Sequence, residues 1–420
     1  MHIDSAYICF MFDILYFVFI LIGNLRHFPA NCMDGFPMIE FELTDTDGNA
    51  RAGVLRTPHA EIQTPVFMPV GTQGTVKTLE NRDLENEDYR IILNNMYHLY
   101  LRPGVELIEN FGGLHNFTGW KRGILTDSGG FQIFSMTGLT KVKEDGVRFQ
   151  SHIDGSYHFF SPERAVEIQY RMRPDIIMAF DECLGYPASD AEIEQSVALT
   201  LKWAKKSKEE WTRRVETDSD ADTAPAIFGI IQGGVDVGLR EYSTAETVKL
   251  NFPGYSIGGL SVGEPKSLMW PALEACIPGL PDDKPRYMMG IGTPADIVEA
   301  VARGVDMFDC VMPTRNSRKG TVFTRRGKLA LKAAYFADDQ KPIDPDCDCY
   351  TCKHYSRALL RHLFNAGEVT SMRLATIHTI HFYKQFMDEI RNAMLNGTFE
   401  SYRENFHKTY IDRLIRPENI

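Results

Sequence analysis

Cysteine is scarce in this chain: eight of its 420 residues are cysteines, and three of the eight fall within one short segment. That distribution does not suit the dense disulfide framework of a secreted protein, and it favours a reducing, cytoplasmic setting. An excess of positive charge is absent as well, because the formal net charge is −11. This balance argues against a protein that coats nucleic acid along its whole surface, although a local basic patch can still attract one.

Long hydrophobic runs are absent outside residues 7–23, YICFMFDILYFVFILIG. This run is at the short end of the roughly 20 residues of a membrane span and contains Asp13, and no Lys or Arg precedes it as in a signal peptide. We therefore expect residues 1–37 to be an apolar extension outside the functional domain, with Met33 or Met38 as the true start and no membrane partner. A membrane anchor or targeting segment is the alternative.

A repeated pattern fills residues 38–420, in which a short apolar run ends in small or polar residues and a helical stretch follows. Apolar runs without alternation indicate strands that are buried on both faces, as in a parallel sheet. Eight such runs predict a (β/α)8 TIM barrel. They lie at residues 66–70, 91–95, 124–128, 176–181, 227–232, 255–260, 287–292 and 307–312.

An open, doubly wound sheet would give the same count of runs, but the ends of the runs favour the barrel. Asp127, Asp181, Gln232 and Asp309 all lie near the carboxyl end of a run. In a barrel these ends converge on one mouth, whereas in an open sheet they would spread along an edge.

Two insertions interrupt the pattern. Residues 141–162 predict a hairpin, with Asp-Gly turns at 145–146 and 154–155. Residues 313–385 form a longer insertion that holds the cysteine cluster. Between the strands, helices are predicted from Ser161, a plausible capping residue, and over residues 189–214, with a polar loop at 215–225.

The cysteine cluster is a C-x-C-x-x-C segment formed by Cys347, Cys349 and Cys352. A C-x-C pair is too strained for an internal disulfide, and thiolates with an imidazole suit zinc, which prefers four tetrahedral ligands. The fourth ligand should be a histidine or a distant cysteine. His378 and His381 lie three residues apart on nearly the same face of a predicted helix, so spacing does not separate them; the other candidates are His354, which is too close in sequence, and His362.

A closed site of this kind is structural and contributes roughly 10–16 kcal/mol of apparent binding energy to folding. We expect it to hold the basic segment before it, residues 313–334, which contains no Asp or Glu. Beside Asp309, such a segment suggests a surface that contacts phosphates, although a solvated charged face is the plainer interpretation. Its cations are Arg315, Arg318, Lys319, Arg325, Arg326, Lys328 and Lys332.

Three acids at strand ends are the candidates for catalysis. Asp127, Asp181 and Asp309 would perturb one another's pKa in a shared pocket. A pair of carboxylates suits chemistry at an anomeric carbon, where one attacks to form a covalent glycosyl intermediate and the other moves a proton. The amide of Gln232 can bind the edge of a base. The alternatives are helix caps for Asp127 and Asp309, and ordinary strand-end roles for Gln232 and Ser128.

These residues lie in motifs that resemble the tRNA-guanine transglycosylase family over residues 38–420. The motifs are TDSGGFQ, FDEC, IQGG, GGLSVGE, GIGTP, MFDCVMPTRN and the cysteine cluster with a downstream histidine. The resemblance implies a TIM-barrel transglycosylase domain with an inserted zinc-binding subdomain. It also implies exchange of guanine at the wobble position of tRNA for a 7-deazaguanine base, on the route to queuosine.

The resemblance implies a role for each matching residue. Asp309 would be the nucleophile, Asp127 the general base, and His378, not His381, the fourth ligand of one structural Zn²⁺ per subunit. Residues that would bind the purine are Ser128, Gly129, Gly130, Phe131, Asp181, Cys183, Gln232, Gly259, Leu260 and Met289. Residues that would contact the tRNA are Gly290, Ile291, Gly292, Thr293, Pro294, Thr314, Arg315, Asn316, Ser317 and Arg318.

Cys183 and Val262 resemble the bacterial members, which use 7-aminomethyl-7-deazaguanine and form homodimers. Thr379 departs from the family, which often has Asn after the zinc histidine. The alternatives are a non-catalytic RNA-binding subunit of a heteromeric transglycosylase, which would lack the acids at 127 and 309, and a barrel glycoside hydrolase, which would not need the basic insertion or the zinc. An archaeal relative would carry further RNA-binding domains at its C-terminus.

Overall fold

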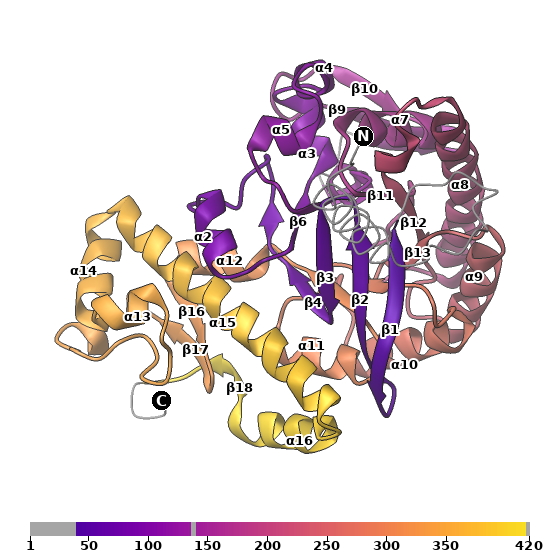
Figure 1. Cartoon of the computed structure of the whole chain (residues 1–420). Helices are drawn as coiled ribbons and strands as arrows, with labels where there is room; N and C mark the ends of the chain where they lie inside the picture. The colour runs from indigo at the N-terminus through magenta and orange to yellow at the C-terminus, as the bar shows by residue number, and fades with distance from the viewer. Residues whose placement is uncertain (1–38, 136–139, 417–420) are drawn as a thin grey trace, which may run out of the picture. The chain divides into compact units, whose positions relative to one another are not determined.

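The computed structural model describes residues 39–135 and 140–416, so the apolar run at residues 7–23 and our expectation for residues 1–37 lie outside the described residues. All eight predicted runs form parallel strands (Figure 1). They are β4 (Val66–Met68) with β5 (Val70–Gly71), β6 (Ile91–Asn94), β7 (Gly123–Thr126), β11 (Ile176–Met178), β12 (Ala226–Ile231), β13 (Gly254–Ile257), β14 (Arg286–Met288) and β15 (Met307–Asp309).

The first barrel strand is split into two halves, and each half pairs with a different neighbour, which closes the barrel. β4 pairs with β15, and β5 pairs with β6. Pro69 lies between the halves, and proline cannot donate to a strand ladder. The remaining strands follow in chain order, so the predicted TIM barrel is confirmed. Apolar side chains such as Leu93, Leu125, Met178 and Ile230 belong to one buried cluster formed largely by these strands.

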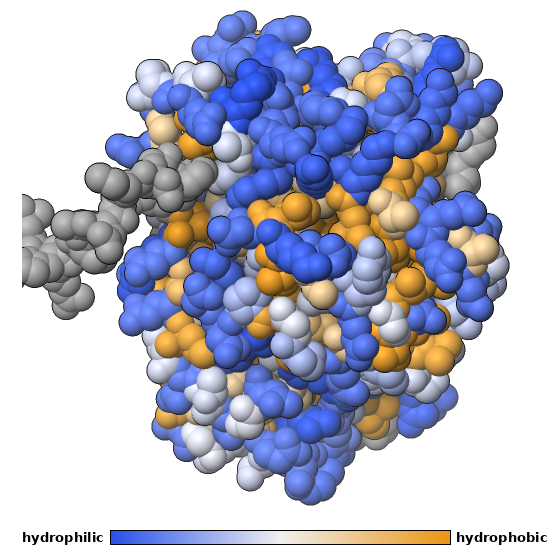
Figure 2. Space-filling model, turned by 90° about the vertical axis from the view of Figure 1, so that its right-hand side faces the viewer, coloured by the Kyte–Doolittle hydropathy of each residue, from blue (hydrophilic) through white to orange (hydrophobic). Residues whose placement is uncertain are grey.

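Helices follow the barrel strands: α7 (Pro162–Met172), α8 (Asp190–Thr217), α9 (Val237–Lys249), α10 (Lys266–Cys276), α11 (Pro294–Val301) and α12 (Met312–Arg318). Ser161 caps α7 as predicted, and Ser189 with Glu192 forms a capping box on α8. α8 continues three residues into the predicted loop, which otherwise holds only a 3₁₀ turn at Ala221–Thr223. Hydrophilic residues cover most of the side on which α8 and α9 lie (Figure 2).

Shorter helices surround the first barrel strands: α2 (Asn81–Asn86), α3 (Met96–Leu101), α4 (Val105–Asn110), α5 (Leu114–Thr118) and α6 (Gly130–Ser135). The predicted hairpin at 141–162 is present with a third strand, as β8 (Lys141–Lys143), β9 (Gly146–Gln150) and β10 (Tyr157–Phe160).

An antiparallel sheet before the barrel was not predicted. It consists of β1 (Glu40–Asp47), β2 (Ala50–Thr57) and β3 (Ala60–Thr64). The signal for it was the Asp-Gly turn at 47–48, where Gly48 has a φ of +63°. Arg51 of β2 donates to Asp306, just before β15, and so joins this sheet to the amino-terminal end of the barrel.

The chain after the barrel forms a subdomain around one long helix. Its elements are β16 (Thr321–Thr324), β17 (Gly327–Ala330), α13 (Tyr350–His354), α14 (Arg357–Ala366), α15 (Val369–Leu395), α16 (Phe399–Thr409) and β18 (Ile411–Leu414). β18 pairs with β17, so the last strand of the described residues joins this subdomain. Within residues 39–135 and 140–416, no helix is both long and apolar enough for a membrane span.

Candidate active site and metal centre

Asp127 follows β7, and its buried carboxylate is held by three donors. Oδ2 accepts hydrogen bonds from Asn95 Nδ2 (2.5 Å) and Gln132 Nε2 (2.9 Å), and Oδ1 accepts one from the backbone N–H of Met96 (2.9 Å). These bonds fix the orientation of the carboxylate. Burial nevertheless raises the pKa of Asp127 to about 6, because it disfavours the charged form more than the donors favour it.

Asp309 ends β15 and is held through one oxygen. Its Oδ1 accepts hydrogen bonds from the Tyr287 hydroxyl (2.6 Å) and the backbone N–H of Gly290 (2.8 Å). Oδ2 receives no hydrogen bond from the described residues, so it is available to a ligand. Burial raises the pKa of Asp309, while both donors act in the opposite direction.

The two acids act on each other electrostatically. The negative charge of Asp309 adds to the raised pKa of Asp127, and both carboxylates raise the pKa of the buried Tyr287 hydroxyl. Asp127 follows β7 and Asp309 ends β15, and the carboxyl ends of barrel strands converge on one mouth. The arrangement provides two acids from separate strands that can act on one ligand.

Asp181 forms a third buried acid beside this pair. Its Oδ2 accepts a hydrogen bond from Gln232 Nε2 (2.7 Å) and its Oδ1 accepts one from Ser128 Oγ (3.3 Å). Burial raises the pKa of Asp181 to about 6. A Cβ added to Gly130 would lie 3.1 Å from Asp181 Oδ1, so Gly130 belongs to the same pocket. The structure thus brings together four of the residues that the sequence predicts for purine binding.

The loop after β13 approaches this pocket closely. Gly259 has a φ of +65°, and a Cβ there would lie 2.1 Å from Gln232 Oε1, so only glycine fits. Glu264 accepts hydrogen bonds from the backbone N–H groups of Ser261 and Val262 and so closes the loop. The buried Arg240 guanidinium donates to backbone carbonyls after β12 and β13, including those of Gly234 and Gly258.

The other predicted purine contacts differ in exposure. Phe131 is 55% exposed on α6, so its side chain is accessible to a ligand. Leu260 is buried, and burial raises the pKa of the Cys183 thiol to about 12, which keeps this thiol neutral. Met289 is half-buried at the end of β14, and Gly129 adopts a positive φ of +76° in the turn after Asp127.

The segments predicted to contact RNA are partly buried. Gly290 and Arg315 are exposed, and Thr293, Asn316 and Arg318 are half-buried. Thr293 caps α11 by accepting a hydrogen bond from the Asp296 N–H. The remaining members are buried among protein groups, so they support the segment from within; they are Ile291, Gly292, Pro294, Thr314 and Ser317.

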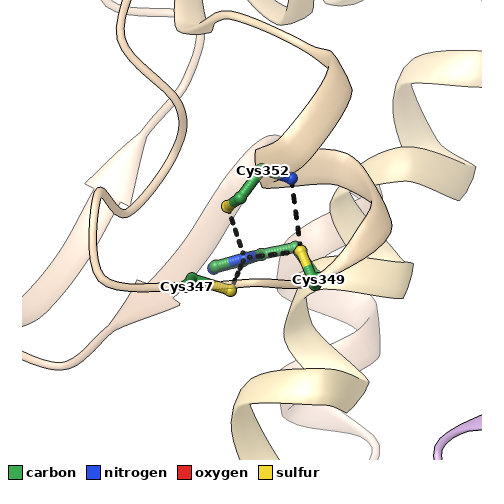
Figure 3. Close-up of side chains that lie close together, drawn as sticks. Cys347, Cys349 and Cys352 are labelled. Carbon is green, nitrogen blue, oxygen red and sulfur yellow. Dashed lines mark hydrogen bonds between the residues drawn. The ribbon is translucent and has the colours of Figure 1, made fainter.

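Three cysteine sulfurs converge on one imidazole nitrogen after β17 (Figure 3). His378 Nδ1 lies 3.5 Å from Cys347 Sγ, 3.6 Å from Cys349 Sγ and 3.4 Å from Cys352 Sγ. Tetrahedral zinc with Zn–S near 2.3 Å and Zn–N near 2.0 Å would place sulfur and nitrogen about 3.5 Å apart. The four side chains therefore form a cluster that can hold a metal ion.

The hydrogen bond of the second ring nitrogen of His378 fixes the tautomer of the ring. His378 Nε2 lies 2.7 Å from the Phe323 carbonyl, so Nε2 carries the proton and Nδ1 keeps its lone pair for a metal. His381 instead contacts Glu87 (2.8 Å) and Asp348 (2.9 Å). The geometry thus separates the two histidines that spacing left open. Thr379 shares a hydrogen bond of 2.6 Å with Ser317, which joins α15 to α12.

A second histidine cluster lies at the other end of the barrel strands. Asp175, before β11, meets His59 Nδ1 at 2.9 Å and His115 Nε2 at 3.1 Å. His115 Nε2 also lies 3.1 Å from the Arg122 carbonyl, so that nitrogen donates a proton and does not offer a lone pair. The centroids of the two imidazole rings lie 3.6 Å apart in a stacked arrangement, and hydrogen bonds to Asp175 hold both rings in place.

Sequence reasoning missed the residues that hold the acids. Asn95 and Gln132 lie inside a predicted strand run and the TDSGGFQ motif, so polarity at a strand end was a usable signal. Tyr287 gave no signal, because a tyrosine at the start of an apolar run is indistinguishable from a core aromatic. Arg240 lies on α9, where a charged residue normally indicates a solvated face, yet it is buried.

Comparison with known proteins identifies the family of this chain. The family model for queuine tRNA-ribosyltransferase matches residues 45–412. A protein named queuine tRNA-ribosyltransferase from Thermoanaerobacter sp. (strain X514) is 53% identical over 374 residues, which cover 89% of this chain and 98% of that protein. Its counterpart from Caldanaerobacter subterraneus subsp. tengcongensis is 54% identical with the same coverage. The counterpart from Thermodesulfovibrio yellowstonii is 49% identical over 88% of this chain and 94% of its own length. The chain therefore belongs to the queuine tRNA-ribosyltransferase family.

Proposed function

We propose that this protein exchanges guanine at the wobble position of a tRNA anticodon for 7-aminomethyl-7-deazaguanine, in queuosine biosynthesis. The observation that carries the proposal is the pair Asp127 and Asp309, two hydrogen-bonded acids at the carboxyl ends of separate strands of one barrel. Membership of the family supports a pentosyltransferase acting on tRNA.

The first half of the reaction forms a covalent intermediate. Oδ2 of Asp309 attacks C1′ of the ribose, the C1′–N9 bond breaks, and its electron pair leaves with guanine, which takes up a proton. Tyr287 and Gly290 hold the opposite oxygen of Asp309, so the attacking oxygen keeps a fixed direction. The product is an ester between Asp309 and the tRNA ribose.

The second half reverses the chemistry with a different base. Asp127 accepts the N9 proton of the incoming deazaguanine, whose nitrogen then attacks C1′ and releases the Asp309 carboxylate. One glycosidic bond replaces another, so the exchange balances without ATP or a redox step. Asp181 and Gln232 would bind the purine edge while Phe131 stacks on it, and Ser128, Cys183, Gly259, Leu260 and Met289 would line the pocket.

The alternative function is a non-catalytic RNA-binding subunit of a heteromeric transglycosylase. Such a subunit has no need for either acid, yet this chain places both in hydrogen-bonded positions at the carboxyl ends of barrel strands. A barrel glycoside hydrolase would not require the basic segment 313–334 or the cysteine cluster. The retained acids with their donors therefore favour a catalytic subunit.

A denaturing gel tests the nucleophile. Wild-type protein incubated with tRNA should give a covalent RNA–protein band, and Asp309→Ala should abolish the band and lower exchange by about 10⁴-fold or more. Asp283→Ala is the matched control, because that carboxylate is 73% exposed and pairs with its neighbour Lys284. A persistent band with Asp309→Ala would refute the assignment of the nucleophile.

Incorporation of labelled base identifies the substrate. The bacterial pattern at Cys183 and Val262 supports 7-aminomethyl-7-deazaguanine, so this base should enter tRNA far faster than queuine. Faster incorporation of queuine would contradict the substrate assignment while leaving the transglycosylase chemistry intact.

Zinc is the metal we assign to Cys347, Cys349, Cys352 and His378, because three thiolates and one imidazole suit a closed tetrahedral zinc site. Bound zinc would stabilise the fold of residues 313–385, within a domain that spans residues 38–420. We further assign a homodimer in the cytoplasm by resemblance to the bacterial members. Sedimentation velocity at micromolar protein concentration tests the dimer.

A further inference from the structure

The sheet of β8, β9 and β10 presents one face to solvent. Residues directly opposite one another in the ladder share a face, and Arg148 is paired with both Lys141 and Phe159. Tyr157, two residues before Phe159, lies on the same face. Tyr157 is 62% exposed and Phe159 is 43% exposed, so two aromatic rings stand on an open surface.

The opposite face of this sheet packs beside the candidate active site. Val147, Phe149 and Phe160 are buried there. The Phe149 ring lies 5.5 Å from the ring of Tyr97, whose hydroxyl lies 3.0 Å from His152 Nδ1. Tyr97 follows directly after Asn95 and Met96, which bind Asp127, so the sheet borders the barrel mouth.

The charges on the open face have one sign. Lys141, Lys143 and Arg148 lie on it, and none of them forms an ion pair with the described residues. The Arg148 guanidinium lies 4.6 Å from the Tyr157 ring centroid. The acidic residues of this segment lie in its turns instead. They are Asp145, Asp154 and Glu144, and Glu144 forms an ion pair with Lys202.

A glycine makes room for one of the two rings. Gly146 stands beside Phe159, and a Cβ at that position would lie 2.9 Å from Phe159 Cζ. The ring therefore lies against bare backbone. Aromatic rings on an antiparallel sheet, with cations around them, are the features of surfaces that bind single-stranded nucleic acid by stacking and phosphate contact.

We propose that the open face of β8–β10 binds unpaired nucleotides of the tRNA that neighbour the exchanged guanine. The proposal rests on the proposed function, because it takes tRNA as the ligand. A base that leaves its stack for the barrel mouth exposes the faces of its neighbours, and Tyr157 and Phe159 offer replacement stacking partners. Lys141, Lys143 and Arg148 are placed for the phosphates between them. This charge favours RNA over a protein partner.

Binding of an unmodified tRNA transcript to the full, zinc-loaded chain tests the proposal. Tyr157→Ala and Phe159→Ala should each raise the Kd for tRNA by roughly 5- to 150-fold, the range expected for one lost stacking contact. Tyr157→Phe should retain wild-type affinity. Tyr242→Ala, at a position that is 53% exposed on α9, is the matched control and should leave the Kd unchanged. The KM for the free base should not change in any of these variants.

Two outcomes would overturn the proposal. One is a Kd within twofold of wild type in the double variant Tyr157→Ala/Phe159→Ala. The other is an unchanged Kd together with an altered sedimentation coefficient, which would make this face a contact between protein chains. Affinity is measured without turnover, so failure of the wild-type protein to exchange the base would contradict the proposed function and leave the binding comparison intact.

Discussion

At the scale of single residues, the acids could be predicted from the sequence but their partners could not. Asp127 and Asp309 stand at the ends of apolar runs, where a barrel gathers functional groups. Their donors come from other strands and turns, such as Tyr287 on β14. Contacts between distant strands depend on strand register and side-chain direction, and a run of apolar residues in the sequence specifies neither. The pKa of each acid depends on these contacts.

Replacement of Tyr287 by phenylalanine tests how Asp309 is held. The tyrosine hydroxyl lowers the pKa of Asp309, so its loss should raise that pKa further. In the proposed mechanism Asp309 must be ionised to attack, and the acid limb of the kcat/KM profile should therefore move to higher pH. A hydrogen bond to a charged group contributes about 1.5–3 kcal/mol, which corresponds to a loss of about 10- to 150-fold at pH 6.

The pH profile of Tyr287→Phe shows whether the hydroxyl orients Asp309 or whether the side chain only fills the core. If Tyr287 serves only to fill the core, Tyr287→Phe should keep the wild-type profile because the ring remains. A profile superimposable on wild type would thus contradict a role of the hydroxyl in orienting Asp309. Thermal unfolding of the same protein serves as the control for stability.

Asp181 makes stability depend on pH. Its pKa is raised by burial to about 6 from 3.8, so the folded state binds the proton more tightly than the unfolded chain does. The resulting stabilisation is complete below pH 3.8, and it is lost as pH rises through about 6. Asp181→Asn removes the buried charge, and the Ser128 hydroxyl can turn to accept a hydrogen bond from the new amide.

We therefore expect Asp181→Asn to be more stable than wild type at pH 8, by up to about 3 kcal/mol, with most of that advantage gone at pH 4.5. Urea unfolding at both pH values measures the difference. An advantage of equal size at the two pH values would show that ionisation of Asp181 is not its cause. The same variant should bind the purine poorly, since its single side-chain oxygen accepts from Gln232 and the second carboxylate oxygen, a further acceptor for the base, is gone.

At the scale of elements, the strands with continuous apolar sequences could be predicted from the sequence. The barrel strands are buried on both faces, so their sequences are continuous apolar runs, and all eight were predicted. β1 to β3 were not. β1 is polar and largely exposed, as in EFELTDTD, and the buried strand β2 contains the charged residue Arg51. The choice between His378 and His381 needed the resemblance or the structure, since both lie on one face of α15.

Those two histidines form a matched pair for testing the metal centre. His378→Ala removes the imidazole that meets three sulfurs, so bound zinc should fall well below one per chain. His381→Ala removes contacts to Glu87 and Asp348 and an interaction with one thiol, that of Cys347, so it should lower the metal content far less than His378→Ala does. Elemental analysis of both purified proteins measures this. Equal zinc contents in the two variants would refute His378 as a ligand.

At the scale of the whole domain, α15 links two distant parts of the described fold (Figure 1). His378 on this helix belongs to the cysteine cluster. Arg391 lies thirteen residues further on, about 20 Å at 1.5 Å per residue. Its Nη1 donates to the carbonyls of Gly53, at 2.9 Å, and of Thr64. One helix therefore reaches both the metal cluster and the sheet before the barrel, which helps to explain how a late insertion and an early sheet become one domain.

Arg391→Ala tests whether this link contributes to stability. The variant leaves two buried carbonyls without their donor, at about 1–3 kcal/mol each, so the free energy of unfolding should fall by roughly 2–5 kcal/mol. Zinc content should not change, because the cysteine cluster lies far along the helix. Arg213→Ala is the control, since that side chain is 59% exposed in an ion pair with Glu210 and should cost less than about 1 kcal/mol. A similarly small effect in both variants would mean that α15 and the sheet before the barrel are held together by apolar packing alone.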